Sequence, residues 1–394
     1  MSEPIVRIAA RGDGVTASGR HAAFAAPGDL LHDDGRVEPG PGHETPPCRH
    51  FPECGGCQLQ HLTDSAYAAY CEQRVTGALA QHGLQTTVRP ALLSAPRTRR
   101  RASLHALRSG GGMAIGFNEA GSRRIVDLRE CHVLAPELFA LLAPLRALLT
   151  KMLAPKRMAS IQMTLVDQGV DLGIAGVAAE GLEAAEALTE FGERNRLARL
   201  SLDEGYGAET RFEPEPATVT LSGIPVAFPS GAFLQATAEG EAVLIASVRE
   251  AVAGSTRTAD LFAGLGTFAL ALDGEVTAAE ASREAVLALR SAANRAVRLV
   301  SADHRDLYRN PYQPKELTSF EAVVLDPPRA GAHEQVSALA ASSVPKIAYV
   351  SCNPATFARD AEVLVRAGYR LDWVQPVGQF RWSTHIELAS SFSR

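Results

Sequence analysis

Residues 258–268 read Thr-Ala-Asp-Leu-Phe-Ala-Gly-Leu-Gly-Thr-Phe, a short apolar run that passes into two glycines. The run predicts a buried strand, and the glycines let the backbone turn sharply beside a ligand before a helix begins. Other short apolar runs, separated by helical stretches, lie at 275–279, 322–325 and 346–350. Apolar strands that alternate with helices are typical of a parallel, doubly wound sheet. The sequence therefore predicts an α/β fold for its C-terminal part.

The glycine loop also indicates the kind of ligand. It lacks the third glycine of the dinucleotide fingerprint and the lysine of a P-loop, which disfavours NAD and ATP. The next strand ends at Glu280, 16 residues after Gly264, and a carboxylate there can accept hydrogen bonds from both hydroxyls of a ribose. Asp303 is the candidate for an adenine amino group, with Asp306 as its rival, although either acid could be a loop or helix-cap residue. We predict an adenosine ligand without a pyrophosphate.

Two further motifs follow strands of the same predicted sheet. Asp326 ends a strand and precedes Pro327-Pro328, a rigid turn that can hold its carboxylate against a planar base. Cys352 follows the strand at 346–350 and precedes two turn formers, so it lies beyond the core segment. Because ligands bind at the carboxyl ends of such strands, both side chains are expected at the site.

A thiol at this position suggests methylation of a pyrimidine. C5 of uracil is a poor nucleophile, but addition of a thiolate at C6 makes C5 an enolate carbon that can attack the methyl group of S-adenosylmethionine. A base must then remove the C5 proton. Glu387 is the candidate, because its apolar neighbours predict a buried strand, where the pKa of a carboxyl rises. The alternative for Glu387 is a paired structural carboxylate.

Four of the six cysteines form a second pattern, Cys-x5-Cys-x2-Cys with a distant fourth member. They are Cys48, Cys54, Cys57 and Cys131. In a cytoplasmic protein, clustered cysteines indicate a metal site, and four thiolates fit either an iron–sulfur cluster or tetrahedral zinc. Three ligands in one loop (residues 46–60, the cysteine loop) and a distant fourth favour the iron–sulfur cluster.

An arginine-rich segment precedes the fourth cysteine. Between Ser94 and Arg129 it carries eight arginines against two acids, in a chain of net charge −5. Such a segment can neutralise the phosphates of RNA, and a solvated face balanced by acids elsewhere is the alternative.

The chain divides into four expected parts. Residues 1–45 predict a short β module, and 46–90 contain the cysteine loop and a helix that buries Cys71. Residues 91–230 predict a central α+β domain with a hairpin at 160–176 and helices at 136–153 and 179–194. A helix at 238–252 opens the Rossmann-like domain, 231–394.

Composition indicates a soluble, cytoplasmic protein. Its 46% hydrophobic and 21% charged residues are ordinary for a globular chain, and no apolar run reaches membrane-spanning length. The first residues lack the apolar core of a secretory signal. We expect a monomer with no membrane partner.

Taken together, these residues resemble the RNA uracil-5-methyltransferase family, specifically the iron–sulfur branch that modifies 23S ribosomal RNA. The resemblance covers nearly the whole chain from about residue 46 onward. It implies that the four patterned cysteines bind a 4Fe–4S cluster, that Cys352 is the nucleophile and that Glu387 accepts the proton. It also implies that Gln235 lies at the cofactor and target-base site. Further positions that match cofactor contacts are Phe262, Thr267, Glu280 and Asp326.

Two features depart from the family pattern. Its members usually begin with a longer β-barrel RNA-binding module than the 47 residues that precede the first cysteine here, which implies a trimmed barrel. Ala263 and Thr267 stand where Cys and Asn are frequent.

Three alternatives remain open. The tRNA-modifying branch generally lacks the four cysteines. An RNA cytosine-5-methyltransferase would carry a Pro-Cys motif, where this chain has Asp326-Pro327-Pro328. A non-catalytic iron–sulfur RNA-binding protein would not need Cys352, Asp326 and Glu387 together.

Overall fold

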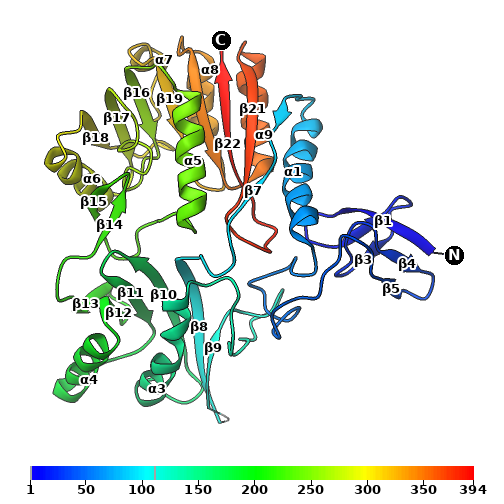
Figure 1. Ribbon diagram of the computed structural model, residues 1–394. Coiled ribbons are helices and arrows are strands. Elements are labelled where there is room, and N and C mark those ends of the chain that lie inside the picture. Colours follow the sequence, from blue (N-terminus) through cyan, green and yellow to red (C-terminus); the bar gives the residue numbers. More distant parts are fainter. Residues whose placement is uncertain (1, 111) are drawn as a thin grey trace.

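The computed structural model describes residues 2–110 and 112–394 (Figure 1). The chain builds an N-terminal antiparallel sheet, a six-stranded sheet from the middle of the sequence and a nine-stranded sheet that holds most C-terminal elements. Within the described ranges, the helices are too short or too polar to cross a membrane.

The N-terminal sheet projects from the rest of the molecule at the right of Figure 1. Its strands, in the order β3-β2-β1-β4-β5, are β1 (Ser2–Ile8), β2 (Gly14–Thr16), β3 (His21–Ala22), β4 (Leu30–His32) and β5 (Val37–Glu38). Ile5 and Leu31 belong to its small apolar core. The alternating apolar positions of this part therefore predict its strands correctly.

Helix α1 (Asp64–Gln81) follows the cysteine loop. Thr63 begins the helix, because its side chain accepts a hydrogen bond from the amide of Ala66. Tyr67, Cys71 and Val75, spaced four residues apart, form its buried face. Cys71 is fully buried, as predicted.

The six-stranded sheet has the order β13-β12-β11-β10-β8-β9. Its strands are β8 (Arg101–Ser109), β9 (Gly112–Gly116), β10 (Met158–Val166), β11 (Gly169–Ala175), β12 (Leu197–Asp203) and β13 (Ala208–Phe212). Helices α2 (Pro136–Ala140), α3 (Leu142–Met152) and α4 (Gly181–Arg194) share one apolar core with it. The hairpin predicted at 160–176 is confirmed as β10 and β11. The single helix predicted at 136–153 is two helices, because Pro144 cannot donate a hydrogen bond to Ala140 and its ring crowds that turn.

The nine-stranded sheet has the order β18-β17-β16-β19-β20-β22-β21-β6, and β7 also pairs with β21. Its parallel strands are β16 (Arg257–Leu261), β17 (Glu275–Glu280), β18 (Val300–His304), β19 (Ala322–Leu325) and β20 (Lys346–Ser351). The remaining strands are β21 (Arg370–Gly378), β22 (Glu387–Ser393), β6 (Thr87–Val88) and β7 (Leu92–Leu93). The predicted parallel core is confirmed. The antiparallel β22, and the entry of residues 87–93 into this sheet, were outside the prediction.

Helices cover both faces of the nine-stranded sheet, as doubly wound sheets require. Helices α5 (Ala238–Ala251) and α6 (Arg283–Arg295) share one core with it. Helices α1, α8 (His333–Ala340) and α9 (Pro354–Arg366) share the other. Shorter elements are β14 (Thr218–Leu221), β15 (Ile224–Ala227) and α7 (Pro314–Leu317). Both faces are thus closed, and ligands reach the sheet at its strand ends.

Candidate active site

The carboxyl ends of the parallel strands border a cavity of about 760 Å³, called the main cavity below. All but one of the predicted catalytic and cofactor residues line it: Gln235, Phe262, Thr267, Glu280, Asp326, Cys352 and Glu387. Cavities of this size accommodate drug-sized or nucleoside-sized ligands. Residues that are distant in sequence therefore meet in one space large enough for an adenosine ligand and a base.

The glycine loop holds Glu280 in place. Oε2 of Glu280 accepts a hydrogen bond from the amide of Gly264 (3.0 Å), and Oε1 accepts one from the amide of Ser282 (2.7 Å). Gly266 has φ +92°, and a Cβ there would lie 2.4 Å from Leu289 in α6. A side chain would therefore push the loop away from its helix, so glycine is required. The fixed carboxylate borders the cavity, which fits the ribose-binding role predicted for it.

Of the two acids proposed for an adenine amino group, only Asp306 lines the main cavity. Asp303 still lies within β18, and its carboxylate is 3.8 Å from the guanidinium of Arg290. Asp306 lies beyond the strand end and accepts a hydrogen bond from the amide of Tyr308 (3.0 Å). The geometry therefore favours Asp306 over Asp303, because the strand continues past residue 303 and carries it out of the site.

Cys352 lies between the end of β20 and the start of α9. The next residue, Asn353, caps that helix by accepting a hydrogen bond from the amide of Ala355 (3.1 Å). Burial and, to a smaller extent, the nearby carboxyls of Glu387 and Asp326 raise the pKa of the Cys352 thiol to about 11. The guanidinium of Arg329 opposes both effects by favouring the thiolate.

Two carboxyls beside the cysteine have raised pKa values. Glu387, the first residue of β22, is 4% exposed, and burial raises its pKa to about 8, with a further contribution from Asp326. Burial also raises the pKa of Asp326, to about 7. A carboxylate with a pKa near 8 is a much stronger base than an ordinary glutamate, which suits removal of a carbon-bound proton.

A buried glutamine pair connects the acids, and the sequence analysis missed one of its members. Nε2 of Gln379 donates a hydrogen bond to Oε1 of Gln235 (2.8 Å), whose own amide nitrogen lies 3.5 Å from Oδ2 of Asp326. The side chain of Gln379 also hydrogen-bonds Glu387 and lowers its pKa. No local motif surrounds Gln379, so only the folded chain reveals its role.

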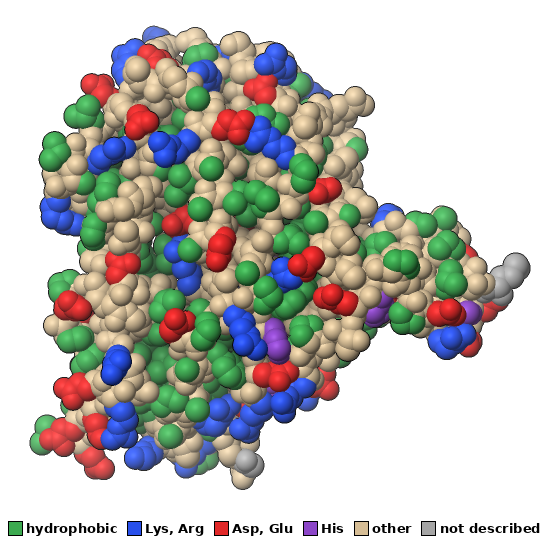
Figure 2. All heavy atoms as spheres, viewed as in Figure 1, with side chains coloured by type: hydrophobic (Ala, Val, Ile, Leu, Met, Phe, Trp, Pro, Cys, Tyr) green, Lys and Arg blue, Asp and Glu red, His purple; other side chains and the backbone are tan. Residues whose placement is uncertain are grey.

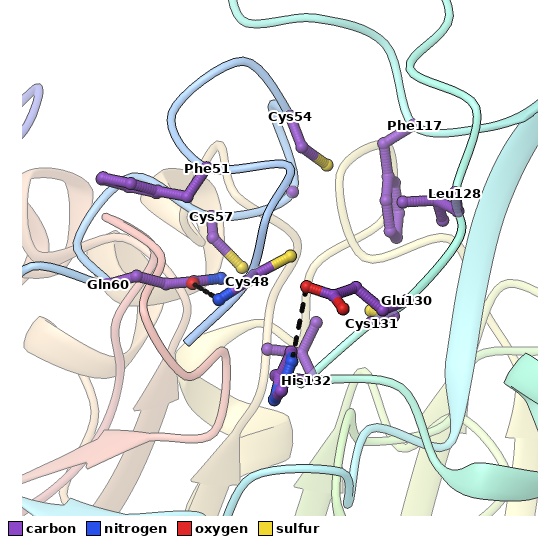
Figure 3. Close-up of a pocket in the computed structure, with 12 residues that line it drawn as sticks. Cys48, Phe51, Cys54, Cys57, Gln60, Phe117, Leu128, Glu130, Cys131 and His132 are labelled. Carbon is purple, nitrogen blue, oxygen red and sulfur yellow. Dashed lines mark hydrogen bonds and ion pairs between the residues drawn. The ribbon is translucent and has the colours of Figure 1, made fainter. Parts of the chain in front are cut away.

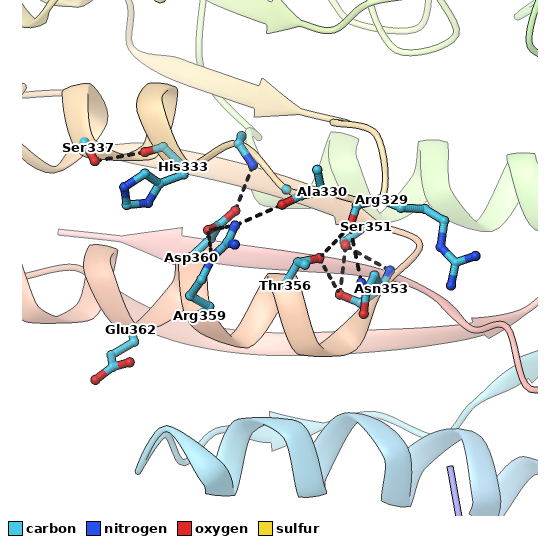
Figure 4. A network of polar contacts seen from close by, with 12 residues as sticks. Arg329, Ala330, His333, Ser337, Ser351, Asn353, Thr356, Arg359, Asp360 and Glu362 are labelled. Carbon is cyan, nitrogen blue, oxygen red and sulfur yellow. Dashed lines mark hydrogen bonds and ion pairs between the residues drawn. The ribbon is translucent and has the colours of Figure 1, made fainter. Parts of the chain in front are cut away.

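The turn after Asp326 is anchored to α9 by a second buried acid (Figure 4). Oδ2 of Asp360 accepts hydrogen bonds from the amide of Ala332 (2.8 Å) and the hydroxyl of Tyr349 (2.7 Å). The carbonyl of Arg329 accepts another from the side-chain amide of Asn353 (3.2 Å). The backbone of Arg329 is therefore fixed at the border of the main cavity.

The four patterned cysteines line one small cavity, the cysteine cavity (Figure 3). Their sulfur atoms face a common space, with Cys131 approaching from the side opposite the loop. All six cysteines lie in the described part of the chain and are free of disulfides. Burial raises the pKa of each patterned thiol, that of Cys57 to about 12.

The donor set in the cysteine cavity is suited to a soft metal. Among the described residues, no group of three or more Cys, His, Asp or Glu side chains has the geometry of a metal site. The four cysteines share a cavity, but their sulfur atoms are not arranged around one ion. Thiols with raised pKa values ionise when a cation binds, and thiolates suit iron–sulfur clusters and zinc. The residues present therefore fit the predicted cluster by their chemistry and their common cavity.

Several arginines of the arginine-rich segment are paired with acids, as in the alternative of a balanced face, whereas Arg97 and Arg123 are exposed. The guanidinium of Arg100 is 2.6 Å from Glu241, and that of Arg124 is 2.9 Å from Glu119. Arg99 lines the main cavity instead of the surface. On the face shown in Figure 2, Lys and Arg side chains gather along the lower edge but alternate with acids. Composition alone could not predict the pair of Arg100 and Glu241, since the two residues lie 141 positions apart in the sequence.

Comparisons with known proteins find similar sequences and a similar fold. The model of the tRNA (Uracil-5-)-methyltransferase family matches residues 219–394. An uncharacterized RNA methyltransferase of Zymomonas mobilis is 48% identical, over 99% of each chain. A 23S rRNA (uracil(1939)-C(5))-methyltransferase of Chromohalobacter salexigens is 32% identical, over 91% of this chain and 78% of its own. A solved structure, Pyrococcus abyssi tRNA (uracil-54, C5)-methyltransferase in complex with S-adenosyl-L-homocysteine, has the same fold, with a TM-score of 0.75 and 23% identity over the whole of both chains.

Proposed function

The chain belongs to the RNA uracil-5-methyltransferase family and is an S-adenosylmethionine-dependent enzyme, and from this premise we propose that it methylates a uridine of 23S ribosomal RNA, with Cys352 as nucleophile and Glu387 as base. One observation carries the residue assignment. Cys352 and Glu387 line the same cavity as Glu280, the residue suited to the ribose of the methyl donor. Nucleophile, base and donor site thus share one space.

The proposed reaction uses Cys352 first. After its proton has passed to solvent, the thiolate adds to C6 of the uracil ring, and the ring becomes an enolate with a nucleophilic C5. C5 takes the methyl group of S-adenosylmethionine, and S-adenosylhomocysteine leaves with the electron pair of the broken carbon–sulfur bond. Glu387 then removes the C5 proton, the C5–C6 double bond forms again, and Cys352 leaves as a thiolate.

The surrounding residues orient the two substrates. Phe262 and Tyr308 have ring centroids 5.6 Å apart at the cavity and provide an apolar surface for the adenosine. Asp306 can accept a hydrogen bond from the adenine amino group. Thr267 also lines the cavity and can contact another part of S-adenosylmethionine. Asp326 and Gln235 lie beside Cys352, where their polar groups can pair with the uracil edge. A uridine within a stem must be flipped out of the helix to reach them.

In this proposal Cys48, Cys54, Cys57 and Cys131 hold a 4Fe–4S cluster. Support comes from the all-sulfur donor set, the common cavity and the arrangement of three ligands in one loop with a distant fourth. When bound, the cluster supplies charge neutralisation and a rigid cross-link between the cysteine loop and the segment of Cys131. The four cysteines position neighbouring backbone and take no part in methyl transfer.

The choice of 23S rRNA rests on two points. The Chromohalobacter relative, which aligns with 91% of this chain, is named as a 23S rRNA enzyme. The cysteine pattern is also typical of that branch of the family. Transfer RNA is the second candidate, because the matching family model is described as a tRNA methyltransferase.

The test is a methyl-transfer assay with anaerobically purified protein. Tritiated-methyl S-adenosylmethionine is incubated with unmodified 23S rRNA or tRNA, and the RNA is digested to nucleosides. Label in 5-methyluridine from 23S rRNA alone is the expected result. Label from tRNA alone would overturn the proposed target while leaving the chemistry in place, and label in 5-methylcytidine would overturn the chemistry.

A further inference from the structure

Trp382 lies between the cysteine cavity and the main cavity. Its indole ring is 3% exposed and packs with Cys57 and Val133 in a small buried cluster of its own. The residues beside it, Phe380 and Ser383, line the main cavity. One side chain therefore packs against a predicted metal ligand, while Phe380 and Ser383 near it in sequence form part of the wall of the reaction site.

The backbone of Trp382 is held by the cysteine loop. Its carbonyl accepts hydrogen bonds from the amides of Gln58 (2.8 Å) and Leu59 (2.9 Å), the two residues that directly follow Cys57. Its φ angle is +58°, a left-handed conformation that is unfavourable for a bulky side chain. Such a conformation persists only when the surroundings enforce it. Here the two amides of the cysteine loop do so.

The indole of Trp382, in this buried cluster with Cys57, carries an unpaired donor. Nε1 is buried and has no hydrogen-bond partner among the described residues. An unpaired buried donor is costly, so an acceptor is expected beside it. Cys57 packs against this ring, so the position of the cysteine loop and that of the indole depend on each other.

The turn at 380–385, called the catalytic turn, leads from Trp382 to Glu387. The amide of Ser383 donates to the carbonyl of Phe380 (2.9 Å), and the hydroxyl of Tyr67 lies 3.1 Å from the carbonyl oxygens of both residues. The turn therefore has two supports, α1 on one side and the cysteine loop on the other. Glu387, the first residue of β22, closely follows this turn.

We propose that Trp382 is a positioning residue that couples metal binding at the four cysteines to the placement of Glu387. The inference rests on the cluster assignment made above. With the thiolates fixed by a metal, Cys57 holds the indole and the following amides hold the strained backbone of Trp382. With the thiols free, the loop relaxes, and the catalytic turn loses one of its two supports.

Hydrogen–deuterium exchange of the peptide 379–388 tests this coupling without measuring activity. Exchange is compared in wild-type protein with its metal and after chelation under reducing conditions. Removal of the metal is expected to raise exchange in 379–388 roughly tenfold, the factor that corresponds to about 1.4 kcal/mol and to the loss of a hydrogen bond. Peptides from β16 serve as the internal reference and are expected to stay unchanged.

The chain offers a matched control, because it has two tryptophans. Trp373 lies in β21 beneath the guanidinium of Arg89, 3.8 Å away. Trp382→Phe removes the indole N–H next to Cys57, and Trp373→Phe makes the same change elsewhere. We expect metal-bound Trp382→Phe to show raised exchange in 379–388, and a methylated protein–RNA adduct to accumulate because proton removal slows. The KM of Trp382→Phe for S-adenosylmethionine should match that of wild type. Trp373→Phe should match wild type both in the exchange of 379–388 and in the amount of adduct.

The outcomes separate this inference from its premise. Iron, sulfide and zinc are first measured in wild-type protein, and the absence of iron and sulfide would overturn the cluster assignment and this inference with it. Iron-loaded protein whose 379–388 exchange does not respond to metal removal would overturn only the coupling. Equal exchange in the two tryptophan variants would remove Trp382 as the link. The comparison in wild type remains decisive even if Trp382→Phe fails to fold.

Discussion

Nε2 of Gln379 donates a hydrogen bond to Oε1 of Gln235 across 2.8 Å, which joins the residue between β21 and the catalytic turn to the segment before α5. Both side chains are buried. Gln379 also contacts Glu387, and Gln235 approaches Asp326. Because amides do not ionise, this bridge keeps its geometry while the two acids gain and lose protons. Neutral amides therefore act on the base alongside the charged groups of Asp326 and Arg329.

Substitution of Gln379 is expected to move the pH profile of catalysis. Its hydrogen bond lowers the pKa of Glu387, so Gln379→Met should raise that pKa above its present value of about 8. Less base is then ionised at neutral pH. At pH 7.5 kcat should fall about tenfold and recover at higher pH, as a one-unit rise in pKa requires. The matched control is Gln375→Met, since Gln375 donates to the carbonyl of Pro90 away from the cavity.

Glu387→Gln should stop turnover but stabilise the free protein at alkaline pH. The folded-state pKa of about 8 lies above the ordinary value of 4.5, so the folded chain binds this proton more tightly than the unfolded chain. Wild type therefore loses stability as the pH rises from about 4.5 to 8. The variant avoids that loss and should exceed wild type by about 4 to 5 kcal/mol at pH 8.5, with little difference at pH 4.5. Calorimetry at the two pH values measures this, and an equal difference at both would contradict it.

Cys352→Ala should abolish methyl transfer while RNA binding survives. The thiol forms the covalent bond, and no other cysteine lines the main cavity within the described chain. Activity should fall below detection, whereas the Kd for RNA should change less than threefold. Filter binding and the tritium assay provide the two readouts. Measurable transfer by the variant would rule out the covalent mechanism.

Asp306→Ala and Asp303→Ala form a matched pair of acid deletions. Asp306 lines the main cavity, so its loss should raise the KM for S-adenosylmethionine roughly tenfold, the cost of one lost hydrogen bond to a ligand. Asp303 contacts Arg290 at the outer edge of the sheet, and its loss should leave that KM unchanged. Initial-rate kinetics with saturating RNA separates the two. A larger effect at Asp303 would restore the assignment made from the sequence.

Gly331→Ala should damage the turn that carries Arg329. Gly331 has φ +83°, and a Cβ there would lie 2.6 Å from Oδ2 of Asp360. The expected loss of stability is about 2 kcal/mol, with slower formation of the protein–RNA adduct. Gly368→Ala is the control, since Gly368 also has positive φ, +98°, but a Cβ there meets no atom of the described chain within 4 Å. Chemical denaturation should show the smaller loss in the control.

Features with a local signal were predictable from the sequence. The apolar runs of the parallel strands depend on a few adjacent residues, and the strands they predict are confirmed. The spacing of the four cysteines is a similar signal, and these cysteines line one cavity, while their metal stays a prediction. Cys352 and Glu387 follow or begin such strands, so the sheet brings them together. Gln235 has no such signal and came only from the resemblance to a known family.

Features that depend on distant contacts were not predictable in this way. Asp303 was preferred to Asp306 because the end of β18 cannot be located to within three residues from sequence. The arginine-rich segment was expected to be free because the partner of Arg100 lies in α5. Gln379 and Trp382 lie in irregular chain, and their importance follows only from what packs against them.

Because β6 and β7 lie on β21, the catalytic sheet is assembled from two separate stretches of the chain. The six-stranded sheet is therefore an insertion between residues 94 and 231. Evolution can enlarge or exchange such an insertion without rebuilding the reaction site, which allows relatives to diverge in substrate while keeping their chemistry. A fragment cut at residue 231 would leave β21 as an unpaired edge and uncover the apolar face beneath α1, so it should aggregate. A fusion of residues 64–93 to 216–394 keeps both covered and retains β14 and β15, which belong to the core shared with α5 and α6, so it is the unit to express alone.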